Sequence, residues 1–479
     1  MRDSTVGWSR GAIDREHGAR SARNIPILLI AVCLIAACLA GTAQAAGESY
    51  WGAAAADSSD TTRAVYHDSP MPITHAVFFW PVRIVTFPLA LLADGVGAGA
   101  EALDKGRVIQ QVGDWVGPRK GPFGVVLGVQ AGGLSGFGAG VSIEHDAFFR
   151  KGNLLRVRAS TTVNGDHRGS VGLRIPTHAG GYSEYGVGYR VRENARYFGI
   201  GPESQKEDES YYKQELFWAG TSLRRNLGGG VFAEGDVLYS SVGAGEPRSD
   251  ASPSISTVFA GNLPPGYGEH SYGVSLGLQL SDENDLTLHR PTKGGSRRVR
   301  VERFESTDRS DIGFWSYRAE LQQFFSLWHP YRVLALRGYG SWLDPSGNDV
   351  IPFQRLMIND TPDALRGYRS FRFRDRGMLS LDAEYRFPII MKQRPGAAGI
   401  DLYPLADWGQ VFARGGEVAF QNMTFSSGLG LRYESISGFV ARVEWARSDE
   451  ENTFNLRMDQ IFQFTKLGFL YGRDPVPAR

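Results

Sequence analysis

The chain has 479 residues, of which 60 are glycine and 12% are aromatic, and its 52 basic side chains nearly balance its 51 acidic ones. A net charge this close to zero gives no sign of a nucleic-acid partner. No uninterrupted apolar run of about 18 residues or more follows residue 45, so no membrane-spanning helix is expected. The mean hydropathy is slightly below zero, which suits a large membrane β-barrel, because half of each strand faces water.

The first 45 residues are predicted to be a signal peptide. Residues 1–24 carry five arginines against three acidic residues, and Ile25 to Ala40 is apolar apart from two cysteines. Ala43 and Ala45 supply the small residues that a signal peptidase reads. A second interpretation treats residues 35–38 as a lipobox, which would leave a lipidated Cys38 at the new N-terminus.

Both cysteines of the chain, Cys33 and Cys38, lie in this segment. If cleavage follows Ala45, the mature protein has no cysteine. The sequence then predicts no disulfide framework, thiolate nucleophile or cysteine metal site.

Two further segments precede the strands. Residues 46–75 are small and polar and are expected to form a flexible leader. Residues 76–119 contain a stretch from Leu89 to Val112 that is compatible with an amphipathic helix on the periplasmic side. Three placements stay open for it: flat on the membrane surface, in the mouth of the barrel, or packed against the periplasmic rim.

Strands dominate the rest of the chain. Between Met378 and Phe387 every second residue is apolar, and Ser380, Asp382 and Glu384 stand between the apolar ones. An apolar face against lipid and a charged face lining a wet lumen are typical of a closed transmembrane barrel. Sixteen such segments are expected at about 123–130, 138–145, 153–163, 168–176, 183–192, 211–223, 230–241, 270–280, 296–305, 314–326, 331–342, 378–388, 400–413, 424–434, 438–447 and 453–464.

The predicted fold class is therefore all-β, a 16-stranded antiparallel transmembrane β-barrel over residues 120–465 with a C-terminal tail at 466–479. The lengths of the connections support it. Long connections at 193–210, 242–269 and 343–377 follow odd-numbered strands. Those after even-numbered strands are mostly short, with 281–295 the exception. Long outer loops and short periplasmic turns are the expected asymmetry.

The connection after the eleventh strand stands out because it is long and rich in arginine. A structureless loop of this length is unusual in a compact barrel. Lumen carboxylates at Asp382, Glu384 and Asp407 could pin it to the inner wall. A solvated cationic loop tip explains the composition equally well. The arginines are Arg355, Arg366, Arg369, Arg372, Arg374 and Arg376.

Two short motifs decide between these interpretations. Leu365-Arg366-Gly367-Tyr368 resembles the Val-Arg-Gly-Phe/Tyr motif of the BamA/TamA-type outer-membrane assembly and translocation superfamily, also called the bacterial surface antigen family. The segment Leu405–Gly409 resembles the family's Phe-x-Asp-x-Gly motif. The resemblance implies that the loop folds inward, that Arg366 pairs with Asp407, that Gly367 lets the backbone turn and that Tyr368 packs the tip.

The chain departs from that family in three places. Leu405 replaces the usual aromatic residue, so the side chains that pack over Arg366 are expected to differ from those of the family. Pro404 removes a ladder donor from the same strand and predicts a bulge or a later strand start. Residues 46–119 show no pattern of a periplasmic POTRA domain, so a member without POTRA domains is expected.

The resemblance also implies a function. The expected role is insertion, assembly or translocation of proteins at the outer membrane of a Gram-negative bacterium, with outer-membrane lipids, client outer-membrane proteins and accessory periplasmic or lipoprotein partners. Gly124 and Gly128 weaken the interior of the first strand, which would let a lateral seam open for a client strand. The alternative is that these glycines only allow curvature.

Two other classes compete. A passive channel or structural barrel would keep the fold without the insertase activity. An enzyme is not expected, because none of the nine histidines lies in a nucleophile context and no metal-ligand spacing or phosphate-binding glycine loop is present. No catalytic residue, metal or cofactor is assigned.

Overall fold

The computed structural model describes only part of the chain. The expected signal peptide, the leader, the 76–119 segment and the 466–479 tail all lie outside the described residues. Described are 123–130, 138–177, 180–248, 253–284, 291–309, 311–328, 332–347, 349–359, 364–391, 399–434 and 440–457.

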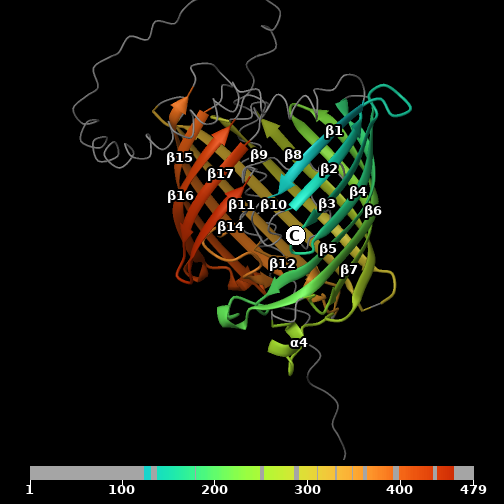
Figure 1. Cartoon of the computed structure of the whole chain (residues 1–479), viewed down its shortest axis with the longest axis vertical. Coiled ribbons are helices and arrows are strands. Elements are labelled where there is room, and N and C mark those ends of the chain that lie inside the picture. Colours follow the sequence, from blue (N-terminus) through green and yellow to red (C-terminus); the bar gives the residue numbers. More distant parts are fainter. Residues whose placement is uncertain are drawn as a thin grey trace, which may run out of the picture. The chain divides into compact units, whose positions relative to one another are not determined.

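One antiparallel sheet of sixteen strands makes up the described part (Figure 1). Each strand is hydrogen-bonded to the next along the chain, and the predicted 16-stranded antiparallel barrel is confirmed. The strands are β1 (Phe123–Gln130), β2 (Gly138–His145), β3 (Leu154–Thr162), β4 (His167–Pro176), β5 (Tyr182–Tyr197), β6 (Ser210–Gly228), β7 (Val231–Gly245), β8 (His270–Asn284), β9 (Gly294–Ser306), β10 (Gly313–Ser326), β11 (Val333–Pro345), β14 (Gly377–Met391), β15 (Gly399–Phe412), β16 (Thr424–Glu434), β17 (Val440–Arg447) and β18 (Asn452–Arg457).

The two faces of the sheet differ as the alternation predicts. On β8, Leu276 and Leu278 are 58% and 59% exposed, whereas the flanking Ser275 and Gln279 are buried. Apolar side chains thus cover the outside, where lipid would lie, and polar side chains face the interior.

Long connections gather at one end of the sheet. In Figure 1 the connection between β7 and β8 carries the short helix α4 (Ile255–Val258) at the lower end. Connections after even-numbered strands of the barrel are short, such as the two residues between β6 and β7. In the hairpin between β3 and β4, Gly165 has a φ of +84°, a backbone conformation that glycine adopts without strain.

The prediction for Pro404 is wrong. Strand β15 begins five residues earlier, at Gly399, and the register against β16 passes Pro404 without a shift. The irregularity lies instead opposite β15, between Pro388 and Ile390 of β14. A proline is tolerated in a strand where its missing donor is not required by the ladder.

Glycine positions on the first strand are paired normally with β2. Gly124 lies opposite Glu144, and Gly128 lies opposite Gly140. Within the described residues, β1 is hydrogen-bonded to β2 and β18 to β17, and the sheet order includes no pairing between β1 and β18. The lateral seam stays a prediction.

A cluster of buried hydrophobic residues lies inside the barrel. It joins aromatic side chains of the inner strand faces, such as Tyr212 and Phe304, to residues of the connection after β11, such as Phe353 and Tyr368. No helix in the described ranges is long and apolar enough to cross a bilayer.

Candidate functional site

The connection between β11 and β14, here called the lumen loop (residues 346–376), is structured and folded inward. It contains a 3-10 turn, η3 (Phe353–Arg355), and two short strands, β12 (Met357–Ile358) and β13 (Arg374–Asp375), which pair with each other. Most of its described side chains are buried. The loop folds inward, as the resemblance implied, and the alternative of a solvated loop tip does not describe it.

Arg366 is the centre of the site and is completely buried. Its backbone N–H donates to Asp407 Oδ2 at 2.9 Å, and its Nε and Nη2 donate to the same carboxylate at 3.0 and 2.6 Å. Asp407, on β15, is also fully buried. A two-pronged guanidinium–carboxylate contact of this kind is strong and directional.

Two further carboxylates meet the remaining prong of the guanidinium. Arg366 Nη1 donates to Glu384 Oε1 at 2.6 Å and to Glu444 Oε1 at 3.1 Å. Burial alone would lower the pKa of the Arg366 guanidinium. The carboxylates of Asp407, Glu444 and Glu384 outweigh this effect and hold that pKa well above its usual value.

Counter-charges balance these carboxylates. Arg386 contacts Glu384 at 2.7 Å, and Arg442 contacts Glu444 at 3.1 Å. Buried charges are tolerated only when they are paired and hydrogen-bonded. The interior around Arg366 is therefore a buried network of ion pairs.

Asp382 was predicted as a partner for the loop arginines and is not one of the Arg366 ligands. It lies opposite Asp407 in the β14–β15 register and contacts Arg337 of β11 at 3.4 Å. The third carboxylate that contacts Arg366 is that of Glu444. The only sign of Glu444 in the sequence is its place among the polar residues that alternate with apolar ones along β17.

The backbone of the motif is fixed as well. The carbonyl of Arg366 accepts hydrogen bonds from Thr453 Oγ1 at 2.6 Å and Asn455 Nδ2 at 3.3 Å, both on β18. The N–H of Gly367 donates to Ser426 Oγ on β16 at 3.2 Å. Together with Glu384, Asp407 and Glu444, these contacts attach one short segment to five consecutive strands, β14 to β18.

Gly367 is required for close approach and not for the turn. A Cβ at this position would lie 2.6 Å from Ser426 Cβ and 2.9 Å from the carbonyl carbon of Arg447. The left-handed residue is the preceding one, since Leu365 has a φ of +54°. Gly409, the last residue of the second motif, makes room for Leu365, whose Cδ1 would be 2.8 Å from an added Cβ.

Tyr368 packs at the tip, as the resemblance implied. Its ring is edge-on to Phe373 with centroids 5.2 Å apart, and its hydroxyl donates to Asp449 Oδ1 at 2.5 Å. Leu405 stands where the family has an aromatic residue, and the aromatic side chain here comes from Tyr403, two residues earlier. Tyr403 packs with Leu405 in one cluster and donates its hydroxyl to Glu444 at 2.8 Å.

The other loop arginines do not all use the predicted lumen carboxylates. Arg369 pairs with Glu209 and Glu451, and Arg372 pairs with Glu450. Those carboxylates come from the β5–β6 connection and the β17–β18 turn, which the sequence could not place beside the loop.

Three arginines are held mainly by other groups. Arg355 donates to Ser271 Oγ at 2.7 Å and lies 4.0 Å from the centroid of the Phe304 ring. Burial lowers the pKa of the Arg355 guanidinium. Arg374 donates to the carbonyl of Phe353, and Arg376 lies over the Trp342 ring.

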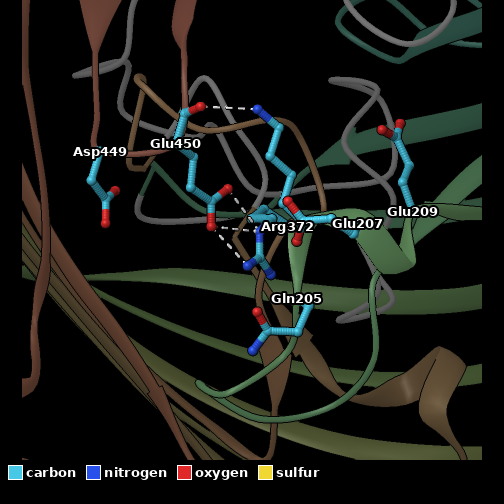
Figure 2. Close-up of a pocket in the computed structure, with 7 residues that line it drawn as sticks. Gln205, Glu207, Glu209, Arg372, Asp449 and Glu450 are labelled. Atoms are coloured by element: carbon cyan, nitrogen blue, oxygen red, sulfur yellow. Dashed lines mark hydrogen bonds and ion pairs between the residues drawn. The ribbon is translucent and has the colours of Figure 1, made fainter.

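A pocket of about 620 Å³ lies where the tip meets its neighbours. Figure 2 shows Arg372 directed at Glu450, with Asp449, Glu207 and Glu209 around the same space. The turn of residues 449–451 is thereby tied to the lumen loop and, through Lys206 Nζ at 2.9 Å from the Glu450 carbonyl, to the β5–β6 connection.

The family model for the Omp85 superfamily domain matches residues 148–464. The chain belongs to the Omp85 superfamily. This confirms the family predicted from the two motifs. A search of curated proteins gave no match.

The fold resembles that of one solved BamA structure at low sequence identity, and two CdiB structures give lower TM-scores. BamA from Haemophilus ducreyi lacking POTRA domains 1–3 is 13% identical, with a TM-score of 0.53, over 71% of this chain and 69% of that one. CdiB from Acinetobacter baumannii is 14% identical, with a TM-score of 0.42, over 69% of this chain and 58% of that one. CdiB from Escherichia coli is 11% identical, with a TM-score of 0.46, over 72% of this chain and 62% of that one.

Proposed function

We propose that this Omp85-type barrel acts in the insertion, assembly or translocation of proteins at the outer membrane of a Gram-negative bacterium. The observation that carries the proposal is the buried attachment of Arg366 to Asp407, Glu384 and Glu444. A buried network of this kind costs desolvation energy, and we infer that its role here is to fix one conformation of the loop.

The proposed mechanism divides the barrel into a fixed and a movable side. Arg366 and Gly367 hold β14 to β18 together from within. The movable side is assigned to strand β1, because Gly124 and Gly128 weaken its interior. A client strand would add to the edge of β1 through main-chain hydrogen bonds, as unpaired sheet edges allow.

Partners follow from this role. Outer-membrane lipids would surround the barrel, client outer-membrane proteins would meet β1, and accessory periplasmic or lipoprotein partners would deliver them. The proposal assigns no catalytic chemistry, metal or cofactor to the barrel.

Site-specific photo-crosslinking tests the proposal. A photoreactive residue is placed at Val125 on β1 and, as a control, at Leu276, a lipid-facing position on β8. We expect unfolded outer-membrane proteins to crosslink to position 125 and not to 276, and depletion of the protein to lower the amounts of those clients. Absence of both effects would contradict the insertase role.

A passive channel is the second candidate. The observation that favours it is a half-buried row of inward arginines on β3 to β5, including Arg156, Arg158 and Arg190. Planar-bilayer recordings on the purified protein would separate the two. A large, stable conductance together with normal client assembly on depletion supports the channel and opposes the insertase.

A further inference from the structure

The turn between β2 and β3 presents an aromatic side chain to its surroundings. Phe149 is 92% exposed and has a φ of +59°, which is uncommon for a residue with a side chain. The turn is nevertheless well ordered by hydrogen bonds. The N–H of Phe148 donates to the Asn153 carbonyl at 3.2 Å, and the N–H of Gly152 donates to the Asp146 carbonyl at 3.1 Å.

Two cations follow this aromatic side chain directly. Arg150 and Lys151 are both exposed. An exposed aromatic ring beside a guanidinium and an ammonium group matches the boundary of a phospholipid bilayer, where rings enter the interface and cations meet phosphates.

The turn also lies where the lipid-facing residues of the first three strands end. Phe123, at the start of β1, is 54% exposed and lies opposite His145. The ring of His145 is edge-on to Phe148 with centroids 6.1 Å apart. Phe123, Phe148 and Phe149 thus form an apolar rim at the short-connection end, beside the first strand.

Exposed aromatic residues also lie at the two ends of other strands, where the membrane surfaces would be. Trp328, in the β10–β11 turn at the same end, is 80% exposed and edge-on to Tyr385 on β14 at 6.4 Å. On the outer face of β10, Trp315 and Phe325 are both exposed. Their separation along a strand tilted by about 40° gives a height of about 25 Å, which equals the apolar band of membrane barrels.

We propose that the 146–153 turn is a binding site for an anionic glycerophospholipid in the leaflet at the short-connection end. Phe149 enters the boundary between headgroups and acyl chains, and Arg150 and Lys151 bind the phosphate. The occupant is a membrane lipid because the cations alone would suit any phosphate, whereas the exposed rings of Phe123 and Phe149 need an apolar phase. This site is independent of the proposed insertase role.

Fluorescence quenching in nanodiscs tests the site on the full-length protein. Phe149→Trp is reconstituted in phosphatidylcholine with either brominated phosphatidylglycerol or brominated phosphatidylcholine as quencher, and the emission of the unsubstituted protein is subtracted. We expect phosphatidylglycerol to quench at a mole fraction about tenfold lower. With Arg150→Glu and Lys151→Glu added, this preference should disappear.

A matched control uses the end of β6, next to the β6–β7 turn at the same end of the barrel. Arg225 and Leu227 are exposed there, and the neighbouring Arg224 is buried, so only one cation is exposed. Arg225→Glu with Leu227→Ala should leave the preference at position 149 unchanged. Heat-modifiable migration verifies that each variant is folded. Equal quenching by the two lipids, no quenching by either, or a preference that survives the charge reversal would each overturn the proposal.

Discussion

The carboxylate of Asp407 accepts hydrogen bonds from the guanidinium of Arg366 at 2.6 Å and from the backbone amide of the same residue at 2.9 Å. One side chain on β15 therefore fixes both the charge and the backbone of the lumen loop. Since both residues are fully buried, water cannot replace either contact, and loss of one partner leaves the other as an uncompensated charge.

Arg366→Ala should destabilise the folded barrel by about 3–5 kcal/mol, because Asp407, Glu384 and Glu444 lose their shared cation. Arg366→Lys should recover only part of this, since an ammonium cannot form the two-pronged contact. Urea unfolding in lipid vesicles measures the change. Arg309→Ala, which removes an exposed ion pair to Asp311, serves as the control and should unfold like the unsubstituted protein.

The carboxylates around Arg366 should contribute unequally to the stability of the folded barrel. Asp407→Asn removes the charge that holds both the side chain and the backbone amide of Arg366. Glu444→Gln weakens only one contact to Arg366, at 3.1 Å, together with the ion pair to Arg442. We expect the urea midpoint to fall more for Asp407→Asn than for Glu444→Gln. A larger effect at Glu444 would show that the β17 contact, and not the β15 contact, carries the attachment.

Gly367→Ala should destabilise the barrel by about 1–3 kcal/mol, because the new methyl group would meet backbone atoms of Arg447 that cannot move away. Gly409→Ala meets only the flexible end of Leu365, so it should cost less and be relieved by adding Leu365→Ala. Gly415→Ala has no atom within 4 Å of the new Cβ and is the control. Similar losses at positions 367 and 415 would contradict the close-approach account.

Arg372 and Glu450, 2.7 Å apart, connect the lumen loop to the β17–β18 turn. Either Arg372→Glu or Glu450→Arg alone should loosen the tip and increase its cleavage by trypsin or by an acid-specific protease. The exchanged pair, with both substitutions, should restore part of the protection. If the double variant is cleaved as fast as the worse single one, the contact does not hold the tip.

The strands could be predicted from sequence because alternation is a local signal. All sixteen segments were found, and β1 and β2 have the predicted bounds. The pair of Arg366 and Asp407 came from a family resemblance, since residues 41 positions apart carry no local sign of contact. Nothing in the alternation separates Glu444, which binds Arg366, from Asp382, which does not.

The remaining differences have physical reasons that act between distant segments. Gly367 was expected to turn the chain, but its role depends on how closely β16 and β17 approach it, which only the folded packing sets. Arg369 and Arg372 found their carboxylates on other connections, because the spatial order of the loops follows from barrel closure and strand tilt.

A double-mutant cycle on Arg366 and Asp407, using Arg366→Ala, Asp407→Ala and the double variant with unfolding free energies measured in lipid vesicles, tests the central claim most directly. The attachment predicts a coupling free energy of about 2 kcal/mol or more, with the double variant little worse than either single one. Additive losses, with a coupling near zero, would contradict it.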